Sequence, residues 1–180
     1  MYLNKEIEFK TFITEEAYNE LVKEFGLENN IFEQINHYFD TEDTKLMKEK
    51  TVLRIRQKGN NYKLTKKTRA DVGADETHIL LSKEKALDYL ANGLDARIIE
   101  IPFYVKKVAE LTTYRCSAPY KSGTIFFDKS VYYDKVDYEI EYEVDDVKQG
   151  LKDFKQFLEK HHINYVESIR KSKRAFDNRK

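Results

Sequence analysis

The feature that most constrains the fold of this chain is a period-two alternation of charged and apolar side chains that recurs along the sequence. In the segment EIEFK, Glu6, Glu8 and Lys10 occupy alternate positions. Alternate side chains of a β-strand point to the same side, about 6.6 Å apart, so such a segment has one charged and one apolar face. The pattern therefore predicts a sheet whose two faces differ in polarity.

The charged faces are also sorted by sign. EIEFK and DYEIEYE carry mainly carboxylates, whereas LRIR and YKLTKKTR carry only Arg, Lys and Thr. A face that merely meets water explains each column alone, but like charges along a ladder are unfavourable, and a solvated face more often mixes signs. Acidic columns suit Mg²⁺ or Mn²⁺, and basic columns suit phosphate oxygens. A ligand that needs both is a metal-bound polyphosphate.

The same patterns place the secondary structure. Strands are expected at residues 2–11, 34–41, 51–58, 62–69, 74–81, 111–118, 123–133 and 135–144. Amphipathic helices are expected after Thr14, from Ser82 to about Leu90 and after Asp145-Asp146, with a short basic helix within residues 167–176. Residues 93–110 are expected to form short helical or irregular pieces.

About eight strands and few helices predict an α+β fold: an eight-stranded antiparallel β-barrel, closed or nearly closed, with helices packed on its outside. If the charged faces point inward as a tunnel, the helices have to cover the apolar outer face, which includes Ile7, Phe9, Leu53, Ile55 and Ile140. With 180 residues and no linker-like segment, we expect one domain spanning 1–180.

Composition narrows the function classes. The chain has 32 basic and 32 acidic residues, whereas a dedicated nucleic-acid binder is usually basic, so we expect no nucleic-acid partner. The single cysteine, Cys116, suits a reducing compartment and is expected to be a small core residue. Neither a membrane-spanning apolar run nor a secretory signal pattern is evident, so we expect a cytoplasmic protein without membrane contact. A homodimer would be unsurprising.

Taken together in chain order, the motifs EIEFK, HYFDT, LRIR, GNNYKLTKK, TYR, FFDKSVYY, DYEIEYE and KSK resemble those of the CYTH domain, or triphosphate tunnel metalloenzyme, superfamily. The resemblance covers most of the chain. It implies an eight-stranded barrel that forms a tunnel, hydrolysis of triphosphate compounds, and Mg²⁺ or Mn²⁺ as cofactor. Known members include inorganic triphosphatases, thiamine triphosphatases and class IV type adenylate cyclases.

The resemblance also assigns roles to residues. Carboxylates expected to hold the metal are Glu6, Glu8, Glu141 and Glu143, with Glu139 as a less certain third residue of the second group. Residues expected to bind phosphate are Lys10, Arg54, Arg56, Lys67, Arg115, Lys171 and Lys173. Asp128 or one of the glutamates would orient or deprotonate the attacking water. Where relatives often carry two alternating acids, this chain has Glu76 and then His78.

Charge sorting and resemblance together predict a metal-dependent triphosphatase whose substrate is most simply inorganic tripolyphosphate, or another triphosphate-containing small molecule or polyphosphate. No covalent intermediate is required. Two alternative enzymatic functions are a thiamine triphosphatase and an adenylate cyclase. In the cyclase, the 3′-hydroxyl of ATP replaces water as the nucleophile. Alternatives outside enzymes are a non-catalytic polyphosphate- or nucleotide-binding module and, third, an RNA-binding barrel. The last is disfavoured because Tyr62 lies on the opposite strand face from Lys63 and Lys67.

Overall fold

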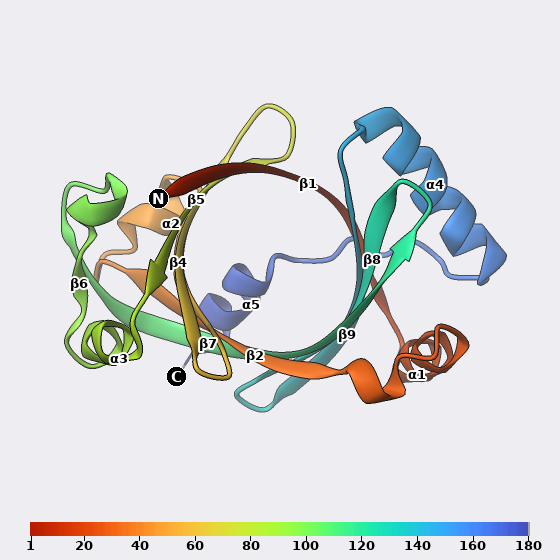
Figure 1. Ribbon diagram of the computed structural model, residues 1–180, viewed down its shortest axis with the longest axis horizontal. Helices are drawn as coiled ribbons and strands as arrows, with labels where there is room; N and C mark the ends of the chain where they lie inside the picture. Colours follow the sequence, from red (N-terminus) through yellow and green to blue (C-terminus); the bar gives the residue numbers. More distant parts are fainter. Residues whose placement is uncertain (180) are drawn as a thin grey trace. The chain divides into compact units, whose positions relative to one another are not determined.

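The alternating segments fold as β-strands in the computed structural model of the chain, which describes residues 1–179 (Figure 1). The strands are β1 (Tyr2–Ile13), β2 (Phe32–Asp40), β3 (Thr51–Lys58), β4 (Asn61–Arg69), β5 (Ala74–Leu81), β6 (Leu94–Asp95), β7 (Tyr104–Tyr120), β8 (Gly123–Tyr132) and β9 (Lys135–Val144). The helices are α1 (Glu15–Glu24), α2 (Lys45–Lys48), α3 (Lys83–Asn92), α4 (Val147–Lys160) and α5 (Lys171–Asp177), with 3-10 turns η1 (Glu28–Asn30) and η2 (Ala96–Ile99).

The strands pair in the order β2-β3-β4-β5-β1-β9-β8-β7-β6, and β2 also pairs with β7. This last pairing closes eight strands into an antiparallel β-barrel and leaves β6 outside the ring. Closure removes the free edges that an open sheet would expose. The predicted α+β fold with an eight-stranded antiparallel barrel is therefore confirmed.

The chain forms two compact units, and β1, β2 and β7 each contribute residues to both. Unit 1 consists of Met1–Lys5, Gln34–Thr112 and Lys171–Lys180. Unit 2 consists of Glu6–Glu33 and Thr113–Arg170. Each unit has its own hydrophobic core.

In unit 2, α1 and α4 pack on the apolar face of the strands. Thr14 caps α1 by accepting a hydrogen bond from the Ala17 amide at 3.2 Å, as its sequence predicts. Ile7 and Phe9 of β1 pack against a core that contains Ile140 and the buried Cys116. Gly150 lets α4 approach closely, since a side-chain carbon there would lie 2.5 Å from Val144. Because Ile7, Phe9 and Ile140 lie under these helices, the charged side chains at alternate positions face the other way.

In unit 1, a second core lies under α2, α3 and η2. It contains Leu53 and Ile55 of β3, Leu64 of β4 and Ala86 of α3, all at most 1% exposed. Ser82 caps α3 by accepting a hydrogen bond from the Lys85 amide at 3.2 Å. The expectation that helices cover the apolar faces of the strands is confirmed in both units.

Two elements differ from the expectation. β7 begins at Tyr104, although a strand was expected only from Leu111; the adjacent Lys106 and Lys107 break the alternation, while pairing with β6 holds this part of the strand. The four-residue helix α2 was not predicted. The backbone amides of Leu46 and Met47 donate to the buried carboxylate of Asp40, at 2.9 and 3.1 Å. Because Asp40 lies six residues before Leu46, this contact produces no periodic pattern in the sequence.

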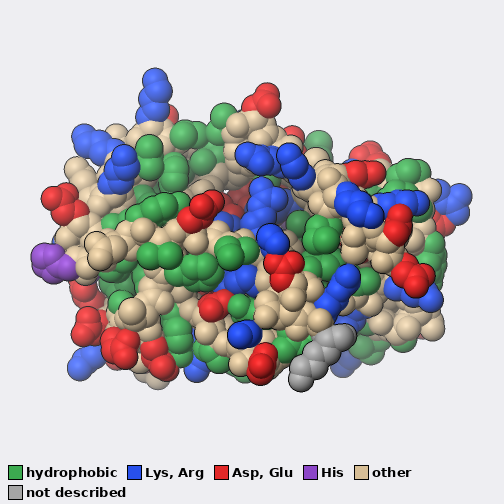
Figure 2. Space-filling model, turned by 180° about the vertical axis from the view of Figure 1, so that it is seen from behind, with side chains coloured by type: hydrophobic (Ala, Val, Ile, Leu, Met, Phe, Trp, Pro, Cys, Tyr) green, Lys and Arg blue, Asp and Glu red, His purple; other side chains and the backbone are tan. Residues whose placement is uncertain are grey.

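The surface carries charges of both signs. On the face shown in Figure 2, Lys and Arg side chains are interspersed with Asp and Glu side chains and with hydrophobic ones. Among the described residues, none of the helices combines the length and apolar character needed to cross a membrane.

Candidate active site

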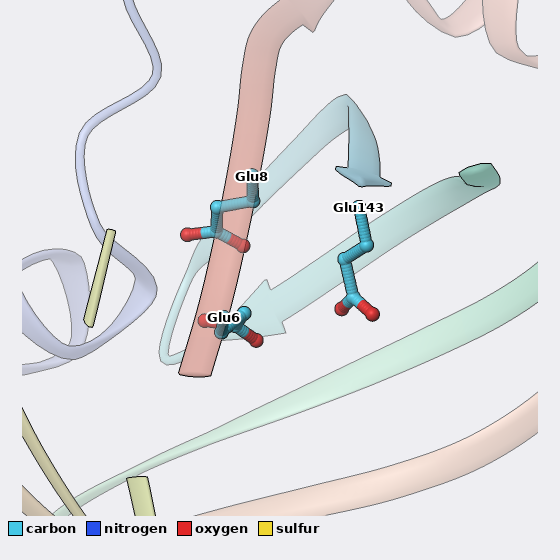
Figure 3. A group of neighbouring side chains, drawn as sticks. All are labelled: Glu6, Glu8 and Glu143. Atoms are coloured by element: carbon cyan, nitrogen blue, oxygen red, sulfur yellow. The ribbon is translucent and has the colours of Figure 1, made fainter. Parts of the chain in front are cut away.

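Three carboxylates from two neighbouring strands of unit 2 lie together, and we call Glu6, Glu8 and Glu143 the β1–β9 cluster. Glu8 and Glu143 are direct partners in the antiparallel register of β1 and β9, and Glu6 lies two residues before Glu8. One oxygen from each carboxylate lies within 4.8 Å of the others, and all three side chains are half-buried (Figure 3). The sequence predicted these three carboxylates as metal ligands, and the register brings them together.

Lys10 continues the charged face of β1. Its ammonium lies 2.9 Å from Glu8 Oε1, and its side chain is 22% exposed. Burial alone lowers the pKa of Lys10, but Glu8 and Glu141 raise it above its ordinary value. Lys10 is therefore a fixed positive charge beside the β1–β9 cluster.

A second group of carboxylates in unit 2, Asp128, Glu139 and Glu141, is called the buried cluster. Their oxygens also lie within 4.8 Å of one another, and the three residues are at most 6% exposed. Arg115 donates to both oxygens of Asp128, at 2.7 and 2.6 Å, and to Glu141. The buried cluster therefore contains its own counter-charge.

The surroundings of Arg115 fix it firmly. Its guanidinium lies 4.5 Å from the centre of the Phe126 ring, and although burial alone lowers its pKa, Asp128 and Glu141 raise the pKa well above its ordinary value. Burial raises the pKa of Glu141, and Arg115 opposes this rise only in part because Glu8 and Asp128 add to it. The hydrogen bonds to Asp128 and Glu141 use Nε and Nη2 of Arg115. A hydrogen bond from Arg115 to phosphate would therefore come from Nη1.

The two clusters differ in their fitness for a divalent cation. Mg²⁺ prefers carboxylate oxygens at about 2.0–2.1 Å, so its ligand oxygens lie about 4 Å apart or less. Both clusters bring one oxygen from each carboxylate within 4.8 Å of the others, so they differ in burial and in their hydrogen-bond partners. In the buried cluster Arg115 already occupies both oxygens of Asp128, and Ser168 donates to Glu139 at 2.5 Å. The donor set of the β1–β9 cluster is the better fit.

The basic face of unit 1 is built by β3 and β4. Arg54 lies opposite Thr65, Arg56 opposite Lys63 and Val52 opposite Lys67 in the antiparallel register, so the charged side chains share one face. Arg56 Nε donates to Asn36 Oδ1 at 3.0 Å, and Asn36 is fully buried. The register thus brings the predicted phosphate ligands Arg54, Arg56 and Lys67 together.

One buried carboxylate, Glu76 of β5, faces these cations. Glu76 Oε1 lies 3.8 Å from Arg54 Nη2 and 3.6 Å from Lys67 Nζ, both beyond hydrogen-bond length. Arg54 Nε is buried and has no hydrogen-bond acceptor among residues 1–179. Burial alone raises the pKa of Glu76, but Arg54 and Lys67 lower it below its ordinary value. The basic face therefore contains one buried guanidinium nitrogen, Arg54 Nε, without an acceptor among the described residues.

Glu76 also contacts His78, the residue that follows it on the same strand face. His78 Nε2 lies 3.2 Å from Glu76 Oε2, and Nδ1 lies 3.0 Å from Thr65 Oγ1. From the sequence, Glu76 and His78 stood out only as a departure from the usual pair of acids, without a role. Their position at alternate residues of a predicted strand was the available signal.

The C-terminal helix α5 carries the two lysines that were predicted to bind phosphate, and their surroundings differ. Lys171 is half-buried, but Lys173 is exposed and lies 2.6 Å from Asp177. The buried cation of this helix is Arg174, which is 4% exposed and was not among the predicted residues. Adjacent Lys173 and Arg174 point to different sides of a helix, and composition alone does not indicate which one is buried.

The sequence of the chain is similar to those of known proteins. The family model of the CYTH domain matches residues 4–176. A Bacillus subtilis protein named "Putative triphosphatase YjbK" is 33% identical over 183 residues, covering 97% of this chain and 96% of that protein.

Two solved structures share the fold. A Bacillus halodurans protein, described as a "putative adenylate cyclase", has a TM-score of 0.89 at 32% identity and covers 97% of this chain and 98% of its own. A Hippeastrum protein, described as a "putative adenylyl cyclase" with "a dominant triphophatase activity", has a TM-score of 0.72 at 19% identity, covering 96% and 95%.

Proposed function

This chain belongs to the CYTH domain family, and from that membership and its sorted charges we propose that it is a divalent-metal-dependent triphosphatase. The proposed substrate is inorganic tripolyphosphate. The observation that carries the proposal is the separation of charge: unit 2 presents three half-buried carboxylates in the β1–β9 cluster, and unit 1 presents the cations of β3 and β4. Hydrolysis of a metal-bound polyphosphate requires both kinds of group.

The carboxylates proposed to hold the metal are Glu6, Glu8 and Glu143, and Glu141 is the neighbour that adds negative charge. A bound Mg²⁺ or Mn²⁺ would neutralise phosphate oxygens and polarise water. Support for this assignment comes from the donor chemistry, because carboxylate oxygens are the ligands that hard divalent cations prefer.

Phosphate binding is proposed for Arg54, Arg56 and Lys67 of unit 1 and for Lys10 and Arg115 of unit 2. The unused Nε of Arg54 supports the first group, because a buried donor without an acceptor is costly unless a ligand supplies one. These cations would stabilise the charge that develops on the leaving phosphate. Lys171 and Lys173 are retained as proposed auxiliary ligands.

We assign the orientation of the attacking water to a carboxylate of the β1–β9 cluster. Asp128, the other candidate, is fully buried and accepts hydrogen bonds from Arg115 on both oxygens. A carboxylate whose oxygens are both engaged is poorly placed to accept a proton from water. Asp128 is therefore proposed to position Arg115.

The proposal is tested with Glu6→Gln and Arg56→Ala, measuring phosphate release from tripolyphosphate with Mg²⁺ and with Mn²⁺. Each substitution is expected to lower kcat/KM by about 100-fold or more, because each removes a charge that acts on the reacting phosphates. Glu20→Gln and Arg97→Ala, both at exposed positions, serve as matched controls and are expected to retain activity. Wild-type rates in the folded Glu6→Gln and Arg56→Ala proteins would contradict the assignment.

A second candidate function is cyclisation of ATP, favoured by the description of the Bacillus halodurans relative. A panel of tripolyphosphate, thiamine triphosphate, ATP and longer polyphosphate separates the candidates when phosphate, pyrophosphate and cyclic AMP are all measured. Cyclic AMP with pyrophosphate would establish cyclisation, and binding without any product would establish a non-catalytic module.

A further inference from the structure

The imidazole of His78 belongs to a buried polar network that the proposed hydrolysis does not use. In the register of β4 and β5, Lys67 lies opposite Glu76 and Thr65 opposite His78. Thr65, Glu76 and His78 are at most 5% exposed. The network therefore links a buried imidazole, through one carboxylate, to two cations proposed to bind phosphate.

The hydrogen bonds fix where the imidazole carries its proton. Glu76 is ionised at neutral pH because Arg54 and Lys67 lower its pKa despite its burial. A carboxylate only accepts hydrogen bonds, so His78 Nε2, at 3.2 Å, carries the proton. Nδ1 of the neutral ring then accepts from the Thr65 hydroxyl at 3.0 Å. A second proton on Nδ1 also finds a partner, because a hydroxyl can rotate and accept.

Glu76 competes with any phosphate for its cations. Its Oε1 lies 3.6 Å from Lys67 Nζ and 3.8 Å from Arg54 Nη2, whereas direct charge-assisted hydrogen bonds are about 2.7–2.9 Å long. A phosphate oxygen that forms short bonds to these two cations weakens their attraction for Glu76. The buried carboxylate then needs another cation nearby.

We propose that binding of a triphosphate at Arg54 and Lys67 is coupled to uptake of one proton by His78, which becomes the cationic partner of Glu76. This inference rests on the proposed function, because it takes Arg54 and Lys67 as phosphate ligands. His78 is thus a positioning residue: it holds Glu76 while the two cations hold the substrate.

The charges that face His78 support the direction of this coupling. They are Arg54 and Arg56 from β3, Lys63 from β4 and Glu76 from its own strand, while the Tyr2 ring of β1 lies 4.8 Å from the imidazole. Burial lowers the pKa of His78, and Lys63, Arg54 and Arg56 lower it further, whereas Glu76 raises it. Phosphate neutralises the cations and leaves the effect of Glu76, so binding raises the pKa of His78.

The test is titration calorimetry of the full chain with tripolyphosphate, without metal so that hydrolysis is blocked, at pH 7 in two buffers of different ionisation enthalpy. Comparing the buffers gives the number of protons taken up on binding. Protons exchanged by tripolyphosphate itself are common to all variants. We expect the wild type to take up close to one proton more than His78→Gln, whereas the control His162→Gln, at an exposed position, equals the wild type.

The affinity provides a second measurement. By linkage, the dependence of log Kd on pH follows the proton count, so the slopes for the wild type and for His78→Gln should differ by up to one log unit per pH unit near neutrality. Equal slopes and equal proton counts in a wild type and a His78→Gln variant that both bind would overturn the inference. Absence of binding by the wild type in this metal-free experiment would overturn the inference, whereas absence of tripolyphosphate hydrolysis with Mg²⁺ or Mn²⁺ would overturn the proposed function and the inference with it.

A measurement on the wild type keeps the inference testable should His78→Gln fail to fold. The chain has four histidines, so its imidazole proton signals can be followed individually by NMR and assigned with Gln variants of His37, His161 and His162. Saturating tripolyphosphate is expected to raise the apparent pKa of the remaining signal, that of His78, by at least one pH unit. An unchanged titration of that signal in the bound protein would refute the proton uptake.

Discussion

The two carboxylate clusters of unit 2 each contain three acids from adjacent strands. They differ in how the repulsion between their negative charges is offset. The buried cluster has Arg115 bonded to Asp128 and Glu141 within it. The β1–β9 cluster is half-buried, with Lys10 beside Glu8 at one side. A buried anion needs a permanent counter-charge because water cannot solvate it, whereas half-buried anions can exchange water for a cation. Burial thus distinguishes the cluster that contains its own counter-charge from the cluster that is proposed to bind the metal.

The largest expected effect comes from removing the internal counter-charge. Arg115→Met leaves Asp128 and Glu141 buried without their guanidinium partner, and breaking such a pair costs about 3–5 kcal/mol. Urea unfolding should show this loss in the free energy of unfolding. Adding Asp128→Asn should recover part of it, and a stability of Arg115→Met equal to that of the wild type would erase the distinction between the clusters.

The next effect concerns activity in the other cluster. Glu143→Gln removes one carboxylate of the β1–β9 cluster and should lower metal-dependent kcat/KM for tripolyphosphate by about 10²–10³-fold. The free energy of unfolding of this variant should stay close to that of the wild type. The substitution relieves the repulsion between the half-buried carboxylates, which offsets any lost interaction. A variant that loses stability and keeps its activity would reverse the roles given to the two clusters.

Metal-induced stabilisation locates the cation without reference to activity. Mg²⁺ or Mn²⁺ at 100 times its Kd should raise the free energy of unfolding of the wild type by about 2.7 kcal/mol. Glu143→Gln should lose this gain, whereas Glu139→Gln, in the buried cluster, should keep it. The opposite pattern would place the metal in the buried cluster.

The smallest expected effect is a change in pH dependence. Burial raises the folded-state pKa of Glu141 above its ordinary value of 4.5, so its contribution to stability is full below that value and is lost as the pH rises through the folded-state pKa. Subtracting the unfolding free energies of Glu141→Gln from those of the wild type should reveal this decline from pH 4.5 upward. A difference that does not change with pH would show that Glu141 keeps an ordinary pKa.

Much of the fold follows from local sequence. Alternation identified β1, β3, β4, β5 and β9, and the caps at Thr14, Ser82 and Asp146 marked the three longer helices. The early start of β7 at Tyr104 and the capping of α2 by Asp40 were not predictable, because each depends on partners distant in sequence. Local periodicity reports which side chains share a face, but not which strands pair.

The same limit of prediction from local sequence applies to the candidate site. The shared faces of Glu6 with Glu8 and of Arg54 with Arg56 follow from alternation alone. The partners of Arg115 do not, because they come from two other strands, and neither does the choice of Arg174 over Lys173 for burial. Identity and alternation indicate which charges face a site, whereas register decides which of them neutralise one another.

The buried Cys116 can be used to detect local opening of the core of unit 2. It is the only cysteine, it is fully buried in the core of unit 2, and burial raises its pKa to about 11. An electrophilic reagent that reacts with the thiolate can therefore label the protein only when this core opens. The rate of labelling then measures how often the scaffold beneath the two carboxylate clusters loosens, with no probe introduced by mutation.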